Sequence, residues 1–229
     1  MNEELMENIM DVNCEYAILL HNRRLPIPQD MQSKEILYWY RNMIFQLTEE
    51  LNVIERRHEV KCICRKGCAH CCKQIIYISS WNNEILKSYL EIQPQRWKNR
   101  IFKKSQVILD KISKTDIPLM ITADDAPDLN QIVRESNEKY FNLNLACPML
   151  TNSRSCGMYF VRPISCWDYR CYGDKRDCKR HAFVDYSMIY PQADFVINEA
   201  FFRIFRTPQF PFYLLPFTIY KHLEVTESD

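Results

Sequence analysis

Glycine is scarce in this chain: only three of its 229 residues are glycine. Loops that hold nucleotide phosphates need several glycines, because their backbone must approach the ligand closely. The scarcity therefore excludes the glycine-rich loops of dinucleotide-binding folds and nucleoside triphosphatases. The His-Glu-x-x-His and Gly-x-Ser-x-Gly signatures of zinc proteases and hydrolases are also absent. Two glycines, Gly67 and Gly157, lie directly beside cysteines, where they would permit tight turns.

The chain also lacks a charge imbalance and a long apolar run. Its formal net charge is +1, which gives no general attraction to nucleic acid or to anionic membranes. The basic run at 170–180 is interrupted by Asp174 and Asp177, which argues against nucleic acid binding. No apolar run reaches the roughly 18 residues of a membrane span. The acidic start, with Glu3 and Glu4, does not resemble a secretory signal, so we expect a cytoplasmic protein without a membrane partner.

Cysteine, in contrast, is abundant and clustered. Eleven cysteines occur, and five of them fall within residues 62–72. A second block follows about 75 residues later, and only Cys14 stands apart. The two blocks contain Cys62, Cys64, Cys68, Cys71 and Cys72, and then Cys147, Cys156, Cys166, Cys171 and Cys178. Clustered thiols either close disulfides or bind a soft metal, and a reducing cytosol favours zinc or iron.

Several arrangements of metal and thiol fit these spacings. Two tetrahedral zinc sites would use eight of the ten clustered thiols. The adjacent pair Cys71 and Cys72 is more easily divided between two sites, or used to bridge two metals. An iron–sulfur cluster is the other candidate, since Cys64-x3-Cys68-x2-Cys71 matches the radical S-adenosylmethionine spacing. The other features of radical S-adenosylmethionine enzymes are not indicated by the sequence. A redox-active Cys68–Cys71 dithiol would need a thioredoxin-like βαβ pattern around it, and none is visible. His70 and His181 are more typical of residues that surround such a site than of ligands.

The pattern of apolar residues predicts a mainly α fold in one domain over residues 1–229. Helices are expected at 3–21, around 37–54, 95–114, 127–142 and 192–205, with a short β-like run at 74–79. Ser79 or Ser80 is expected to cap another helix. Asp124, Asp125 and Asp128 fit a helix N-terminus better than a hard-cation site. The expected regions are N-terminal helices at 1–61, a cysteine-cluster metal-binding region with irregular cysteine-rich loops at 62–180, and a helix with an aromatic tail at 181–229.

The residues also resemble a known family. Cys64-Arg-Lys-Gly-Cys68-Ala-His-Cys71-Cys72 is similar to the signature of the cysteine-cluster family of zinc- or iron-chelating domains, named for its CxxCxxCC pattern. Cys147-Pro-Met-Leu, Cys156-Gly-Met-Tyr and Arg162-Pro-Ile-Ser-Cys166 resemble the second half of that signature, so the likeness covers roughly residues 62–180. The first spacing is three residues rather than two, and Trp167 replaces a common arginine. A similar block occurs in flagellin lysine-N-methylase.

The resemblance implies a metal site of about eight cysteines, with zinc or iron, including an iron–sulfur cluster, as cofactor. The implied ligands are Cys64, Cys68, Cys71, Cys72, Cys147, Cys156, Cys166 and one of Cys171 and Cys178. Arg162 or Arg170 could offset the negative charge of clustered thiolates. We therefore expect a metal-binding protein with one polynuclear centre or two neighbouring ones. The alternatives are a methylase-like enzyme or subunit that modifies a protein or peptide, and a zinc-stabilised adaptor that binds a partner through its aromatic tail.

Overall fold

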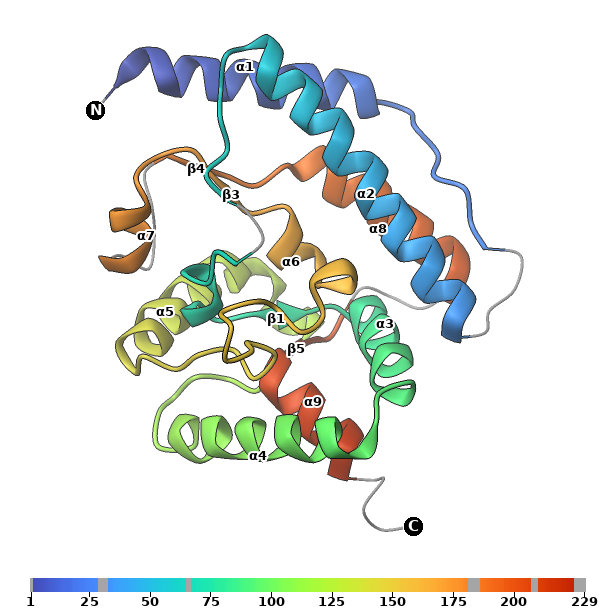
Figure 1. Ribbon diagram of the computed structural model, residues 1–229, viewed down its shortest axis with the longest axis vertical. Coiled ribbons are helices and arrows are strands. Elements are labelled where there is room, and N and C mark those ends of the chain that lie inside the picture. The colour runs from blue at the N-terminus through green and yellow to red at the C-terminus, as the bar shows by residue number, and fades with distance from the viewer. Residues whose placement is uncertain (1, 29–32, 65–66, 181–185, 207–209, 225–229) are drawn as a thin grey trace. The chain divides into compact units, whose positions relative to one another are not determined.

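The computed structural model describes residues 2–28, 33–64, 67–180, 186–206 and 210–224. The protein is mainly helical, as the sequence predicts, with only short strands. The chain divides into two compact units, and each combines segments that are distant in sequence (Figure 1). The first unit contains Met1–Arg65 and Ile164–Arg206, and the second contains Lys66–Pro163 and Thr207–Asp229. Neither unit is a contiguous stretch of sequence, and the single domain over residues 1–229 stays a prediction.

Three long helices build the first unit. They are α1 (Glu3–Leu20), α2 (Ser33–Arg57) and α8 (Pro191–Phe205), and α1 packs against both of the others. Helices α1 and α2 bury the apolar faces that the sequence predicts, and α8 buries a face of its own that consists of Ala193, Val196, Ile197, Ala200 and Phe201. The buried Tyr16 hydroxyl of α1 donates to the Leu47 carbonyl of α2 at 2.9 Å, while Tyr40 stacks on Phe201 of α8 at 5.8 Å between ring centroids. These aromatic contacts form the core of the unit.

Short elements complete the first unit between Ile164 and Met188. The region is irregular, as expected, because no run there is long enough for a full amphipathic helix. It comprises α6 (Ile164–Trp167), β3 (Arg170–Cys171), α7 (Lys175–Arg180) and β4 (Ser187–Met188). Strands β3 and β4 pair antiparallel, with Cys171 opposite Ser187. This strand pairing fixes the backbone of Cys171.

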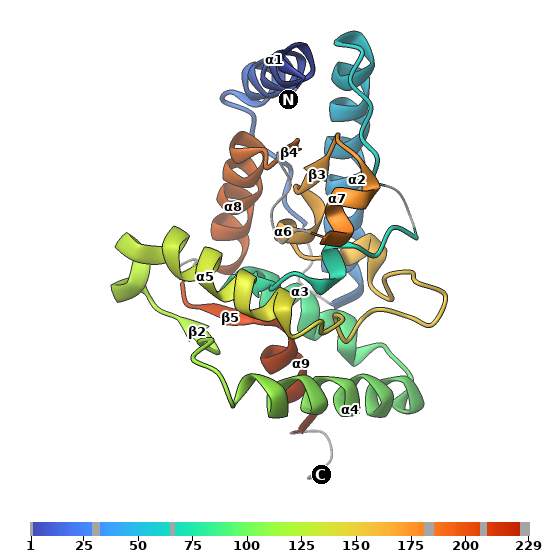
Figure 2. The ribbon, with the colours of Figure 1, turned by 90° about the vertical axis from the view of Figure 1, so that its left-hand side faces the viewer.

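The second unit surrounds a small antiparallel sheet with helices (Figure 2). Its strand order is β1-β5-β2, so β5 (Phe212–Leu214) is the central strand between β1 (Tyr77–Ile78) and β2 (Met120–Ile121). The helices are α3 (Ser80–Glu91), α4 (Gln95–Ile112), α5 (Leu129–Asn142) and α9 (Leu215–Glu224). Short 3-10 turns are η1 (Cys71–Lys73), η2 (Ala123–Asp128) and η3 (Tyr159–Val161).

Two predicted helix starts are confirmed in the second unit. The Ser79 hydroxyl accepts a hydrogen bond from the backbone N–H of Asn82 and so caps α3. Asp125 and Thr122 form a reciprocal capping box at η2, immediately before α5. Asp125 thus has the helix-capping role that the sequence favoured over cation binding.

The aromatic tail is the main departure from the expected elements. Its residues 212–224 form β5 and α9, where the sequence suggested only an irregular aromatic segment. Pro216 does not prevent a helix, because it is the second residue of α9, where a missing N–H is harmless. Leu214, Leu215 and Ile219 are each at most 2% exposed. This part of the tail therefore completes the core of the second unit.

Candidate thiol metal centre

The cysteines are divided between the two units, and the division does not follow the two sequence blocks. The first unit holds Cys62, Cys64, Cys166, Cys171 and Cys178, together with the isolated Cys14 of α1. The second unit holds Cys68, Cys71, Cys72, Cys147 and Cys156. Each unit thus receives thiols from both sequence blocks. All eleven cysteines lie in the described part of the chain, and none of them forms a disulfide there.

In the first unit, an extended segment after α2 meets strand β3. The backbone N–H of Ile63 donates to the Cys171 carbonyl at 2.9 Å. In return, the N–H of Cys171 donates to the Cys64 sulfur at 3.3 Å. The Cys62 sulfur accepts a hydrogen bond from the N–H of Cys64 at 3.4 Å. This pairing brings residues 62–64 of the first block directly beside the second block.

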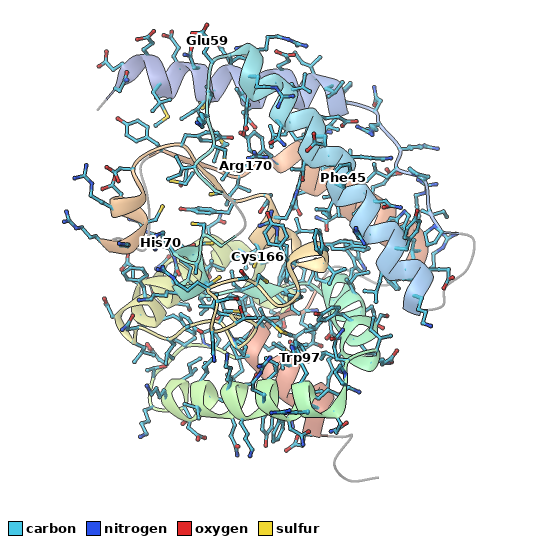
Figure 3. All side chains as sticks on the ribbon, in the orientation of Figure 1. Phe45, Glu59, His70, Trp97, Cys166 and Arg170 are labelled. Atoms are coloured by element: carbon cyan, nitrogen blue, oxygen red, sulfur yellow. The ribbon has the colours of Figure 1, made fainter. Side chains whose placement is uncertain are left out.

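Helix α7 then returns a further thiol to the same place. The Cys178 sulfur lies 3.4 Å from the Cys171 sulfur. Cys171 is buried, Cys178 is half-buried, and Cys64 is exposed. Cys64, Cys171 and Cys178 therefore form a connected set, which we call the first-unit thiol set. Cys166 lies on α6 of this unit and Arg170 on β3 (Figure 3).

Arg170 is held beside the first-unit thiol set by a buried polar network. Its Nε lies 2.9 Å from Glu55 Oε1, and its guanidinium also donates to the Asn52 side-chain oxygen at 2.7 Å. The Tyr172 hydroxyl donates to the same Glu55 carboxylate at 2.7 Å. A hydrogen bond from the Cys64 thiol, and then the charge of Arg170, lower the pKa of Cys62 to about 5, although burial acts against them. Arg170 therefore lies close to the Cys62 thiol, and its role in offsetting the charge of metal-bound thiolates stays a prediction.

In the second unit, the turn η1 carries two neighbouring thiols. The N–H of Cys147 donates to the Cys72 carbonyl at 2.7 Å, which joins the second block to the first. A hydrogen bond to Cys72, followed by burial, raises the pKa of Cys71 well above its usual value. Burial likewise raises the pKa of Cys156. The charge of Arg162 partly opposes both increases, which places the Arg162, Cys71 and Cys156 side chains in one neighbourhood.

A narrow loop presents Cys147 and Cys156. Leu150 and Cys156 form an isolated antiparallel bridge, and the N–H of Gly157 donates to the Met149 carbonyl at 2.8 Å. A Cβ at Gly157 would lie 3.1 Å from that same carbonyl oxygen, so any larger residue would crowd this close approach. We call Cys71, Cys72, Cys147 and Cys156 the second-unit thiol set. The glycine turn that the sequence predicted beside Cys156 is therefore present.

The remaining candidates have less defined roles. Cys68 is half-buried in the second unit and follows Gly67, whose φ of 90° is a conformation that favours glycine. His70 immediately precedes η1 and is half-buried, and His181 lies outside the described residues. Within the described ranges, no three His, Cys, Asp or Glu side chains are grouped closely enough to hold a metal ion as they stand. The thiols approach one another chiefly in pairs.

Comparison with known proteins adds no assignment. No protein-family model matches the chain, and neither the curated proteins nor the solved structures contain a significant match. The resemblance to the cysteine-cluster family therefore stays a prediction from the motifs. In the described part of the chain, no helix combines the length and apolar character that crossing a membrane demands.

Proposed function

We propose that the protein binds a soft metal, zinc or iron, through cysteine thiolates, with one centre in each unit. The observation that carries the proposal is the meeting of Cys64 with Cys171 and Cys178. Cys64 and Cys171 are 107 residues apart in sequence, yet a hydrogen bond joins them at the end of a short strand pairing. Apolar packing alone gives no reason to bring thiols together from two distant loops. A shared ligand gives one.

The spacing of the sulfur atoms suits metal better than a disulfide. Two thiolates on one tetrahedral zinc lie about 3.8 Å apart, which follows from Zn–S bonds of about 2.3 Å. The Cys171–Cys178 sulfur separation of 3.4 Å is close to that value. A disulfide requires about 2.05 Å. Closing the first-unit centre needs inward movement of Cys64, whose thiol is exposed, and a fourth donor from Cys62 or Cys166.

The second-unit thiol set supports the same chemistry. Cys71, Cys72, Cys147 and Cys156 supply four soft donors, which is the number that a closed tetrahedral zinc site uses. The charge of Arg162 favours the thiolate form of Cys71 and Cys156 and partly opposes the burial that raises the pKa of both. Four thiolates on Zn²⁺ have a formal charge of minus two, so an adjacent guanidinium would stabilise the metal-bound form.

The two rival functions receive different support. An adaptor that binds through its aromatic tail is less favoured, because Leu214, Leu215 and Ile219 of that tail are buried in the second unit. Its phenylalanines, Phe210, Phe212 and Phe217, are half-buried. A methylase-like enzyme is not favoured by any particular contact among the thiols. A structural or metal-handling centre needs only the donors described above, and metal binding would stabilise the irregular loops that carry them.

The first experiment is metal and acid-labile sulfide analysis of protein purified without oxygen, with its visible absorption spectrum. Stoichiometric zinc in a colourless sample supports structural zinc. Iron with matching sulfide in a brown sample supports iron–sulfur clusters. If neither metal is present while the thiols are free and reduced, metal binding is refuted.

Paired cysteine variants then test the assignment to units. Cys64→Ser/Cys171→Ser changes two sequence blocks but one unit, so about half of the metal should be lost. Cys64→Ser/Cys71→Ser changes one sequence block but both units, so nearly all of the metal should be lost. The exposed Cys14 of α1 provides the matched control, and Cys14→Ser should retain full metal content. Complete loss from either single variant, Cys64→Ser or Cys71→Ser, would instead mean one shared assembly.

A further inference from the structure

The second unit contains a cavity of about 820 Å³ between α4 and the loop that carries Cys147 and Leu150. Its volume lies in the range of small-molecule sites. Four cationic side chains of α4 line it, and no acidic residue does. These cations are Arg96, Arg100, Lys103 and Lys104. The cavity is thus strongly positive, although the chain as a whole is nearly neutral.

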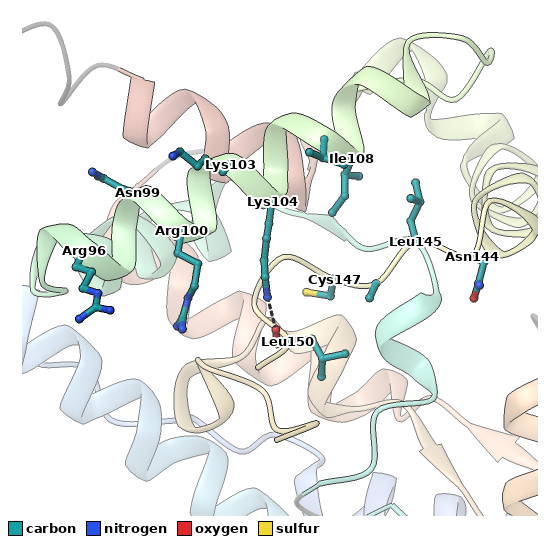
Figure 4. Close-up of a pocket in the computed structure, with 12 residues that line it drawn as sticks. Arg96, Asn99, Arg100, Lys103, Lys104, Ile108, Asn144, Leu145, Cys147 and Leu150 are labelled. Carbon is teal, nitrogen blue, oxygen red and sulfur yellow. Dashed lines mark hydrogen bonds between the residues drawn. The ribbon is translucent and has the colours of Figure 1, made fainter. Parts of the chain in front are cut away.

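Three of these cations share one face of the helix. Arg96, Arg100 and Lys104 are spaced four residues apart and extend from the same side of α4 toward the loop (Figure 4). The Lys104 ammonium donates to the Leu150 carbonyl at 2.6 Å. The opposite face of α4 packs on α9, where Phe102 stacks on Tyr220 at 4.9 Å. The cationic face therefore stands on a helix that packing holds in place.

No carboxylate pairs with these charges within the described part of the chain. None of Arg96, Arg100, Lys103 and Lys104 forms an ion pair there. Like charges on neighbouring turns of a helix repel one another. A bound anion would remove that repulsion and supply charge-assisted hydrogen bonds, which arginine makes especially well with phosphate.

The remainder of the cavity wall is apolar. Val107, Ile108, Leu145, Ala146 and Leu150 line it. Cations on one wall and aliphatic side chains on another suit a ligand with a charged part and an apolar part. We infer that this cavity binds a phosphorylated small molecule that also carries an apolar or aromatic group. Because Cys147 is also part of the wall, such a ligand would lie beside the second-unit thiol set.

Isothermal titration calorimetry of the full chain with tripolyphosphate and with ATP tests the inference, with metal content measured before and after. Both probes should bind saturably, and ATP should bind more tightly because its adenosine can contact the apolar wall. Arg100→Gln/Lys104→Gln should raise the Kd of both probes at least tenfold. The matched control is Lys98→Gln/Lys111→Gln, which removes the same charge from residues of α4 outside the cavity and should change the Kd less than twofold.

Four results would overturn the inference. If neither probe bound saturably, the cavity would not be a phosphate site. If Arg100→Gln/Lys104→Gln and Lys98→Gln/Lys111→Gln raised the Kd equally, the binding would be general electrostatic attraction to the helix. Hexaglutamate binding without phosphate binding would make the cavity a docking surface for acidic peptide. If tripolyphosphate and ATP bound with equal affinity, the apolar wall would not contribute to binding, and the ligand would need no apolar group.

Discussion

The backbone N–H of Cys171 donates to the sulfur of Cys64, 107 residues earlier, at 3.3 Å. The reciprocal side of this pairing is the bond from the Ile63 N–H to the Cys171 carbonyl. Together they fix the first-block segment against strand β3. The structure thereby joins the two cysteine blocks inside the first unit, whereas Cys64 and Cys68, only four residues apart, belong to different units. The metal analysis of paired variants follows directly from this division.

Removing Arg170 should strongly destabilise the first unit. Arg170 and Glu55 form an ion pair whose side chains are only 11% and 6% exposed. Arg170→Leu leaves the Glu55 carboxylate buried without its countercharge, which typically costs about 3–5 kcal/mol in the free energy of unfolding. Urea denaturation followed by circular dichroism measures the loss. Adding Glu55→Gln should recover most of it, because no buried charge then remains.

An exposed ion pair serves as the control for Arg170. Arg176 pairs with Asp174, but their side chains are 76% and 42% exposed. Arg176→Leu should leave the urea midpoint unchanged, since water already solvates both charges. Equal effects of Arg170→Leu and Arg176→Leu would contradict the structural role assigned to the buried network.

Glycine at position 157 should be necessary for the loop that presents Cys147 and Cys156. Gly157→Ala places a Cβ 3.1 Å from the Met149 carbonyl oxygen, a backbone atom that cannot rotate away. We expect a loss of about 1–3 kcal/mol in the free energy of unfolding, as for other overpacked sites. Asn152→Ala, at the exposed tip of the same loop, is the control and should cost little. Unchanged stability of Gly157→Ala in urea denaturation would show that the close approach is not needed.

His222 should make the stability of the second unit depend on pH. Burial, and then the charge of Lys87, lower the pKa of His222, whose Nε2 lies 2.7 Å from the Asn83 side-chain oxygen. Below about pH 6.5 the unfolded chain takes up the proton before the folded chain does, so stability falls as pH decreases from there. Urea midpoints at pH 7.5 and 5.5 measure the fall, which should be smaller in His222→Gln.

The exposed His21 provides the comparison for His222. His21→Gln should retain the full difference between the two urea midpoints. If His222→Gln retained that difference as well, other groups would be responsible for the pH dependence.

The C-terminal aromatic segment should behave as core rather than as a partner surface. Ile219 is fully buried in α9, and Ile219→Ala should cost about 2–5 kcal/mol, as in other large-to-small core substitutions. Phe202, which is 52% exposed on α8, should tolerate the change to Ala with little effect in the same urea experiment. Truncation before Thr207 removes β5 and α9 and should cause aggregation. A soluble, folded truncated protein would contradict this assignment.

Local features of the fold could be predicted from the sequence because they depend on neighbouring residues. Apolar residues at helical spacing gave α1, α2, α4 and α8 close to their observed bounds, and Ser79 indicated the start of α3. Strand β5 and helix α9 were missed. Their residues, rich in proline and aromatics, resemble an irregular segment until the central position of β5 in a sheet and the burial of Ile219 are known.

By itself, the sequence determined which chemistry is available: ten clustered thiols, flanking arginines, and glycines where the backbone turns or approaches closely. It could not determine which thiols lie near one another. Cys64 and Cys68 are only four residues apart, yet they belong to different units. Tertiary structure decided that, through the pairing of residues 62–64 with β3 and of Cys72 with Cys147. The same holds for the cationic cavity. Its arginines and lysines are visible in the sequence, but only folding places the apolar loop of Leu145 and Leu150 opposite them.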